Sequence, residues 1–225
     1  LIFVLYLDIT LNFFNLGIIV LFLVWMSNLF NFMDGSDGMA AGMAVIGFFS
    51  YAIASYMVGD FSFALENGII MMCSLGFLFF NFSPAKIFMG DVGSISLGFL
   101  AGAMGIIGWQ KEIWALWFPL LIFSPFIIDA TTTLLKRILK REKFWQAHRE
   151  HYYQRLVLLG WSHKKTALVL YVVMICLALI SFYINNDDYN KLILAIILFF
   201  YSLSMLYIDK IWKDYLLNNR NFDNK

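Results

Sequence analysis

Long apolar runs separated by short polar segments dominate the sequence and predict a bundle of membrane-crossing helices. The runs are close to twenty residues long, which is the length of helix that crosses a bilayer core of about 30 Å. The short run Leu1 to Leu7 looks like the end of an earlier span. We expect full spans over roughly 15–30, 39–58, 67–83, 93–109, 113–135, 166–184 and 191–208. The pattern therefore predicts an all-α, polytopic transmembrane bundle that forms one integral-membrane domain over 1–225.

Composition supports this prediction and excludes several other classes of protein. The 225 residues are 61% hydrophobic and only 14% charged, whereas a soluble domain carries about 25% charged residues. The net charge is +1 and no basic stretch is interleaved with aromatic residues, so we expect no nucleic-acid partner. The sequence begins with leucine and has no signal-peptide pattern. We therefore expect it to be the C-terminal part of a longer protein.

The distribution of cations predicts which ends of the spans face the cytoplasm. The longest connecting segment, 136–165, holds nine of the sixteen Lys and Arg residues. Segments this rich in cations lie on the cytoplasmic side of a membrane. Alternation from there places 31–38, 84–92 and 209–225 on the same side. Together with 136–165, these segments hold fourteen of the sixteen cations.

Four carboxylates cluster at the predicted cytoplasmic ends of spans: Asp34 and Asp37 in "DGSDG", Asp91 in "GDVGS", and Asp129. Ionisable residues at such positions indicate function by default. Two carboxylates three residues apart share one side of a helical turn, and oxygen ligands of this kind suit Mg²⁺. A polar turn whose aspartates cap the next helix would give the same pattern. The "DGSDG" segment alone leaves both readings open.

The segment around Asp91 combines a carboxylate, a predicted helix start and a nearby cation. A helix N-terminus holds phosphate through its free N–H groups, and Lys86 adds a positive charge five residues earlier. The alternatives are an ordinary N-cap for Asp91 and a snorkelling lysine for Lys86.

A third polar stretch, "HREHYYQRL" at 148–156, places ionisable residues on one helix face. His148, His151, Tyr152 and Arg155 fall at i, i+3, i+4 and i+7. Two histidines and an arginine on one face are suited to a nucleotide diphosphate, since Arg binds phosphate in a bidentate manner. An amphipathic helix on anionic lipid is the alternative, and zinc is less favoured because a third ligand is missing.

Taken together, the three stretches resemble one enzyme family. "NxxNxxDGxDGMA" at 28–40, "FNFSPAKIFMGDVGSISLG" at 80–98 and "HREHYYQRL" are similar, in this order, to the polyprenyl-phosphate N-acetylaminosugar-1-phosphate transferases. The resemblance implies that a lipid phosphate attacks the β-phosphorus of a UDP-N-acetylaminosugar and releases UMP. It also implies Mg²⁺, with Mn²⁺ as the alternative, and a site that faces the cytoplasm from the bacterial inner membrane.

The resemblance also assigns roles. Asp34, Asp37 and Asp91 match the family's catalytic carboxylates, with Asp91 and Asp34 as metal ligands. With the charge arguments above, it implies substrate-binding roles for Asn28, Asn31, Asn81, Lys86, His148, His151 and Arg155. The expected partners are the UDP-N-acetylaminosugar, the polyprenyl phosphate and membrane lipid, and a homodimer is compatible with them.

Two departures from the family pattern qualify the expectation. H-R-E-H replaces the three adjacent histidines of the branch that uses a MurNAc-pentapeptide, and this form looks like the O-antigen or capsule initiators. The family's aspartate-rich DDxxD motif has no counterpart in the sequence, so an inactive fragment of the transferase is one alternative. An ion- or proton-coupled transporter is another, although it would place charge near the bilayer midplane. Clustering at one face favours the enzyme.

Overall fold

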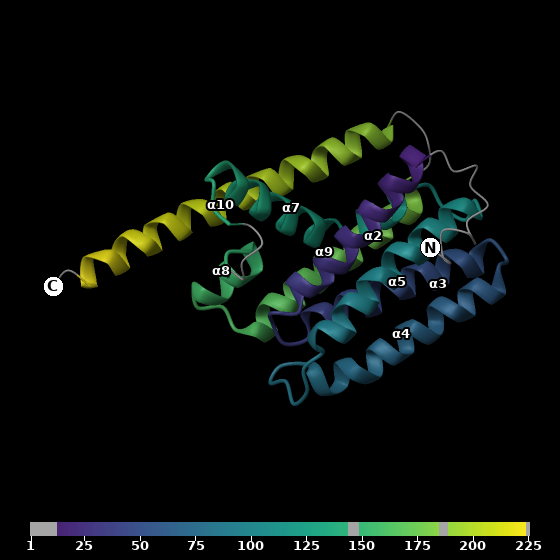
Figure 1. Cartoon of the computed structure of the whole chain (residues 1–225), viewed down its shortest axis with the longest axis horizontal. Helices are drawn as coiled ribbons and strands as arrows, with labels where there is room; N and C mark the ends of the chain where they lie inside the picture. Colours follow the sequence, from purple (N-terminus) through teal and green to yellow (C-terminus); the bar gives the residue numbers. More distant parts are fainter. Residues whose placement is uncertain (1–12, 144–148, 185–188, 224–225) are drawn as a thin grey trace.

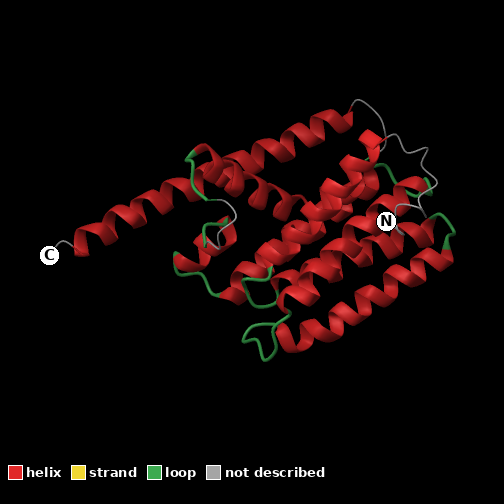
Figure 2. Cartoon of the chain, in the orientation of Figure 1, coloured by secondary structure: helices red, strands yellow, loops and turns green. Residues whose placement is uncertain are grey.

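The computed structural model describes residues 13–143, 149–184 and 189–223, and over these ranges the chain consists of helices and loops without a strand (Figure 2). The partial span expected at Leu1 to Leu7 lies outside the described residues. The long helices are α2 (Phe13–Met33), α3 (Met39–Met57), α4 (Phe61–Asn81), α5 (Gly90–Gln110), α9 (His163–Tyr183) and α10 (Tyr189–Asp223). The short helices are α6 (Trp117–Ile122), α7 (Ser124–Leu139) and α8 (Tyr152–Leu158).

All six long helices have the length and apolar character needed to cross a membrane. The predicted all-α transmembrane bundle is therefore confirmed. Helices α2, α3, α4, α5 and α9 run side by side, and α10 lies along one edge of the bundle and extends well past it (Figure 1).

The prediction of one continuous span over 113–135 is wrong. The structure has two helices there, α6 and α7, which meet at Phe123. Pro125 is the cause, because it has no N–H to donate to the carbonyl of Leu121 four residues earlier. The Ser124 hydroxyl donates to that carbonyl instead, at 2.7 Å, so the break leaves the buried oxygen satisfied.

One predicted loop boundary is also wrong. Helix α4 begins at Phe61 rather than near 67, because the Asp60 carboxylate accepts a hydrogen bond from the Phe63 N–H at 3.0 Å and caps the helix start. The segment 209–223, expected as a cytoplasmic tail, continues α10 as helix. This segment has no proline or glycine, and its lysines and leucines favour helix in water.

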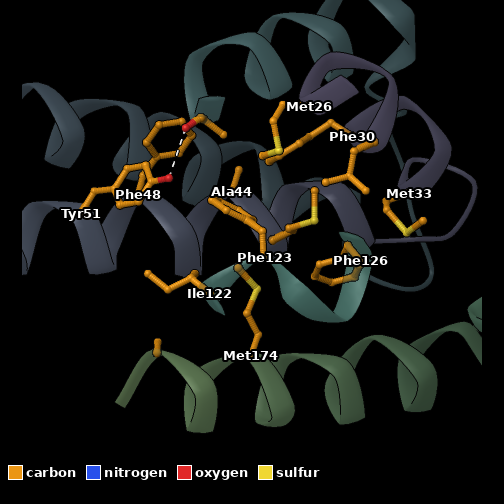
Figure 3. Packing of buried hydrophobic residues seen from close by; sticks show 14 of the residues in the cluster. Met26, Phe30, Met33, Ala44, Phe48, Tyr51, Ile122, Phe123, Phe126 and Met174 are labelled. Carbon is orange, nitrogen blue, oxygen red and sulfur yellow. Dashed lines mark hydrogen bonds between the residues drawn. The ribbon is translucent and has the colours of Figure 1, made fainter. Parts of the chain in front are cut away.

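The core lies where α2, α3, α7 and α9 meet. Phe30 and Phe123 pack edge to face, with ring centroids 5.8 Å apart, and Met174 reaches them from α9 (Figure 3). The Tyr51 hydroxyl donates to the carbonyl of Ala101 at 3.2 Å, which joins α3 to α5 (Figure 3). This packed centre holds the helix ends that carry the polar motifs in fixed positions.

Helices α2 and α5 approach closely through a glycine. A Cβ atom placed on Gly98 would lie 2.4 Å from the carbonyl oxygen of Met26 and 2.7 Å from the Cα atom of Ser27. Both are backbone atoms, so the two helices can keep this separation only with glycine at position 98.

Candidate active site

The three polar motifs come together at one end of the bundle. The turn 34–38 between α2 and α3, the segment 82–89 between α4 and α5, and helix α8 all lie at this end, whereas the turn 58–60 lies at the other (Figure 1). The predicted clustering on one face is therefore present in the structure.

Backbone hydrogen bonds to two carboxylates join the "DGSDG" turn to the "GDVGS" segment. Asp34 Oδ2 accepts from the N–H of Gly90 at 3.1 Å, and Asp37 Oδ2 accepts from the N–H of Ala85 at 3.2 Å. Motifs that are about fifty residues apart in the sequence thus form one polar surface. The carboxylates are half-buried, so both retain access to solvent.

The Asn81 side chain also joins the turn 34–38 to the segment 82–89. Its Oδ1 accepts from the N–H of Gly38 at 3.1 Å, and its Nδ2 donates to the carbonyl of Ile87 at 2.9 Å. Gly38 has a φ of 74°, a left-handed conformation that glycine adopts without strain. Asn81 is buried with both ends of its amide engaged, so the geometry favours a positioning role over direct contact with a substrate.

The two asparagines of α2 differ in their surroundings. Asn31 Oδ1 accepts from the hydroxyl of Ser94 at 3.0 Å, which ties α2 to the first turn of α5. Asn28 is exposed, and its Nδ2 donates to the carbonyl of Val24 in its own helix at 2.8 Å. Asn28 is therefore the more accessible of the two predicted substrate ligands.

Asp91 and Lys86 are the exposed charges of this surface. Asp91 lies in the first turn of α5, and the described structure shows no hydrogen bond or ion pair to its carboxylate. Lys86 is exposed as well, and its backbone N–H donates to the carbonyl of Phe80 at 2.8 Å. Both side chains can reach a ligand without breaking a contact seen in the described residues.

Helix α8 is oriented by a carboxylate that the site predictions left out. Asp129 of α7 accepts from the N–H of Tyr152 at 2.9 Å and from the N–H of Tyr153 at 3.0 Å. These are the first two N–H groups of α8, so Asp129 stabilises the helix N-terminus. His151 Nδ1 lies 3.3 Å from the same carboxylate. His148 falls outside the described residues.

Tyr153 fixes α8 against the "DGSDG" turn. Its hydroxyl donates to the carbonyl of Phe32 at 2.7 Å, and a Cβ atom on Gly35 would lie 2.6 Å from the same oxygen. His151 stacks on Phe32 with ring centroids 5.3 Å apart. The third motif therefore rests directly on the first.

Arg155 is engaged within the protein. It is buried, its Nε donates to the carbonyl of Glu150 at 2.8 Å, and its Nη1 lies 2.8 Å from Asp209 Oδ1 on α10. The predicted phosphate contact of Arg155 would have to replace or share these bonds, so the structure favours a structural role for it.

His163 joins the site without having been predicted. Its Nδ1 lies 2.7 Å from the hydroxyl of Ser36, so the start of α9 contacts the "DGSDG" turn. The sequence signal was present in "GWSHKK", which directly follows the third motif.

Comparison with known proteins agrees with this arrangement. The family model described as glycosyl transferase family 4 matches residues 2–109, which include "DGSDG" and "GDVGS". A Bacillus subtilis protein named as a probable undecaprenyl-phosphate N-acetylglucosaminyl 1-phosphate transferase is 35% identical over 156 residues, covering 68% of this chain and 44% of the relative. The chain belongs to glycosyl transferase family 4.

Other relatives are similar over more of the chain. Phospho-N-acetylmuramoyl-pentapeptide-transferase of Staphylococcus epidermidis is 33% identical over 79% of this chain and 54% of the relative. The enzyme of the same name from Halalkalibacterium halodurans is 30% identical over 80% of this chain and 54% of the relative. The chain spans about half the length of these relatives.

The carboxylates of this family 4 chain fit Mg²⁺ better than a metal that needs several protein ligands. Within the described ranges, no three or more His, Cys, Asp or Glu residues gather closely enough to hold a metal ion. Mg²⁺ binds through one or two carboxylates and completes its shell with water and phosphate. Asp34 and Asp91 can supply such a pair, because the charge of Asp91 acts on Asp34.

The surroundings of Asp34 displace the pKa of its carboxyl group. Burial raises its pKa from 3.8 to about 6, the N–H of Gly90 opposes the rise, and the charge of Asp91 adds to it. Because the folded pKa lies above the unfolded value, the contribution of Asp34 to stability is complete below 3.8 and is lost as pH rises through about 6.

We therefore expect the Asp34→Asn variant to lose part of the pH dependence of stability. Without divalent cations, thermal unfolding of the parent between pH ~4 and ~8 should show stability that declines through the pKa of Asp34, and the variant should show a flatter profile. Glu66→Gln, an exposed carboxylate on α4, is the matched control. Identical slopes for Asp34→Asn and the parent would contradict the displaced pKa.

Proposed function

We propose that this chain carries the active site of a Mg²⁺-dependent enzyme that transfers an N-acetylaminosugar 1-phosphate from a UDP-sugar to polyprenyl phosphate. The supporting observation is the joining of three motifs at one end of a transmembrane bundle. Asp34 and Asp37 bind the backbone of the segment that presents Lys86 and Asp91, and α8 packs on the turn that contains Asp34. A single surface of this kind can receive two phosphate groups at once.

The proposed reaction is a direct displacement at phosphorus. A phosphate oxygen of the lipid forms a bond to the β-phosphorus of the nucleotide sugar, and the bond from that phosphorus to the bridging oxygen breaks. The electron pair remains on the bridging oxygen, which leaves as part of UMP. Two anionic phosphates repel each other, so the reaction requires positive charge at the point where they meet.

The residues of this chain have separate tasks in the proposal. Asp91 and Asp34 would hold Mg²⁺, which when bound offsets negative charge on the reacting phosphates. Lys86 is exposed on the segment that joins α4 to α5 and is suited to a phosphate oxygen. Asn81 and Asp37 fix the backbone that carries these groups. Mn²⁺ could occupy the same oxygen ligands in place of Mg²⁺.

The substrates and the location form the finer part of the proposal. Relatives named for undecaprenyl-phosphate N-acetylglucosaminyl and phospho-N-acetylmuramoyl-pentapeptide transfer support a UDP-N-acetylaminosugar and a polyprenyl phosphate as substrates. The H-R-E-H form supports an initiating step of a surface glycan such as O-antigen. The concentration of cations at 136–165 supports a site that faces the cytoplasm from the bacterial inner membrane.

The decisive experiment is release of UMP by the purified complete gene product that contains this chain. Protein in detergent or nanodiscs is incubated with undecaprenyl phosphate and a panel of UDP-N-acetylaminosugars, with Mg²⁺ or with a chelator. We expect UMP and a lipid-diphospho-sugar to form in equal amounts, and only with divalent cation. UMP formation that does not require the lipid phosphate would contradict the proposal. The same assay on the chain 1–225 alone tests whether this chain is sufficient for the reaction.

A further inference from the structure

One carboxylate of α10 binds both α8 and α7. Asp209 contacts two side chains of α8, Arg155 Nη1 at 2.8 Å and the hydroxyl of Tyr152 at 3.1 Å, and the ammonium group of Lys136 on α7. Both carboxylate oxygens take part. We call Asp209, Arg155, Tyr152 and Lys136 the α10 clamp.

Aromatic rings enclose the arginine of this clamp. The Arg155 guanidinium lies 5.0 Å from the ring centroid of Tyr152 and 5.7 Å from that of Trp212, one turn further along α10 than Asp209. Arg155 is only 6% exposed. A charge-assisted hydrogen bond between partly desolvated groups is stronger than an exposed surface ion pair.

Helix α8 depends on such contacts, because its length alone cannot hold it in place. It has seven residues, and isolated helices shorter than about 12–15 residues are marginal in water. Tyr152 and Tyr153 are buried, but a cavity of about 540 Å³ lies between α7, α8, α9 and α10, and these two side chains and Leu156 line it. Polar contacts therefore add to the packing of the two rings in placing the helix.

Different helices hold α8 at its start and at its middle. Asp129 of α7 holds the first N–H groups, and Asp209 of α10 holds Arg155 in the next turn. Between them, the Tyr153 hydroxyl bonds the carbonyl of Phe32 at the end of α2 and lies against Gly35, next to Asp34. A chain of contacts thus runs from the last helix to the carboxylates of the candidate site.

We infer that Asp209 is a positioning residue, which acts through Arg155 to hold α8 and its His151 against the "DGSDG" turn. The effect of Asp209 on turnover rests on the proposed function. Its effect on the position of α8 does not. The clamp lies outside residues 2–109, the part of the chain that the family model covers.

The test uses Asp209→Asn in the complete gene product, with two companion variants. Asp214→Asn removes an exposed carboxylate from the same helix and is the matched control. Asp209→Glu keeps the charge and is the conservative rescue. Hydrogen exchange of the backbone amides is followed separately for α8 and for α2 to α5, and UMP release is measured in parallel.

We expect Asp209→Asn to raise amide exchange in α8 and to leave exchange in α2 to α5 unchanged. Because the lost hydrogen bonds are to a charged group, α8 should exchange about tenfold faster or more, and kcat/KM should fall by a similar factor. Asp214→Asn should match the parent, and Asp209→Glu should recover most of both signals.

The two readouts separate the two proposals. The clamp is overturned if amide exchange in α8 of Asp209→Asn stays at the parent level. It is also overturned if exchange rises equally in α8 and in α2 to α5. Turnover that is unchanged while α8 exchanges faster would overturn its positioning role in the reaction. A parent protein that releases no UMP would contradict the proposed function, and the exchange data would still decide whether Asp209 holds α8.

Discussion

Asp91→Asn is expected to lower UMP release by at least about 10²-fold while the protein still folds and inserts, because this carboxylate is exposed and, within the described residues, bonded to no other group. Its proposed task is to hold Mg²⁺ between two phosphates, and the neutral amide cannot offset the charge of a cation. The measurement is initial-rate UMP release at saturating concentrations of both substrates.

The change in stability should be much smaller than the change in activity. Asp91 lies in the first turn of α5, where a negative charge contributes about 0.3–1 kcal/mol. Glu66→Gln, which removes an exposed carboxylate from α4, should leave the rate unchanged. UMP release by Asp91→Asn within about twofold of the parent would remove Asp91 from the proposed site, since a metal ligand contributes far more than that.

Gly98→Val should have the largest effect on folding. Even a single Cβ atom at this position would lie 2.4 Å from the carbonyl oxygen of Met26, so α2 and α5 must separate. Overpacking of this kind costs about 1–3 kcal/mol, and each kcal/mol lowers the midpoint of unfolding by about 2–4 °C in a chain of this size. Thermal unfolding of the purified protein in detergent measures the shift.

Gly76→Ala is the matched control for this prediction. Gly76 lies within α4, and a Cβ atom there would meet nothing within 4 Å. Alanine is a better helix former than glycine by about 1 kcal/mol, so this variant should be as stable as the parent or more so. If Gly98→Val unfolds at the same temperature as Gly76→Ala, then the close approach of α2 and α5 does not limit stability.

Hydropathy predicted α2, α3, α5 and α9 within a few residues, because each apolar run is bounded by charged or glycine-containing turns. Hydropathy failed at 113–135, because the mean hydropathy of this segment does not reveal that Pro125 has no N–H to donate. After residue 208, charged residues end the apolar run but continue α10 as helix, which hydropathy does not reveal.

Sequence reasoning predicted that the polar motifs cluster but could not assign the partners of their side chains. Asp34 and Asp37 bind the segment that leads to Asp91, so the three carboxylates share one end of the bundle, as the distribution of cations predicted. The hydrogen bonds of Asn81 and Arg155 depend on segments far away in the sequence, so no spacing rule reveals them. Asp209 lies in a charged segment with no motif, and only the packing of α10 brings it to Arg155.

The length of α10 sets the depth at which Asp209 lies. A helix rises about 1.5 Å per residue, so Asp209, twenty residues after Tyr189, lies about 30 Å along the axis, which equals the thickness of the hydrocarbon layer. The ionic contacts of Asp209 can thus form at the lipid headgroups, where water and phosphate are available. The remaining turns, up to Asp223, carry α10 about 20 Å further along its axis than Asp209.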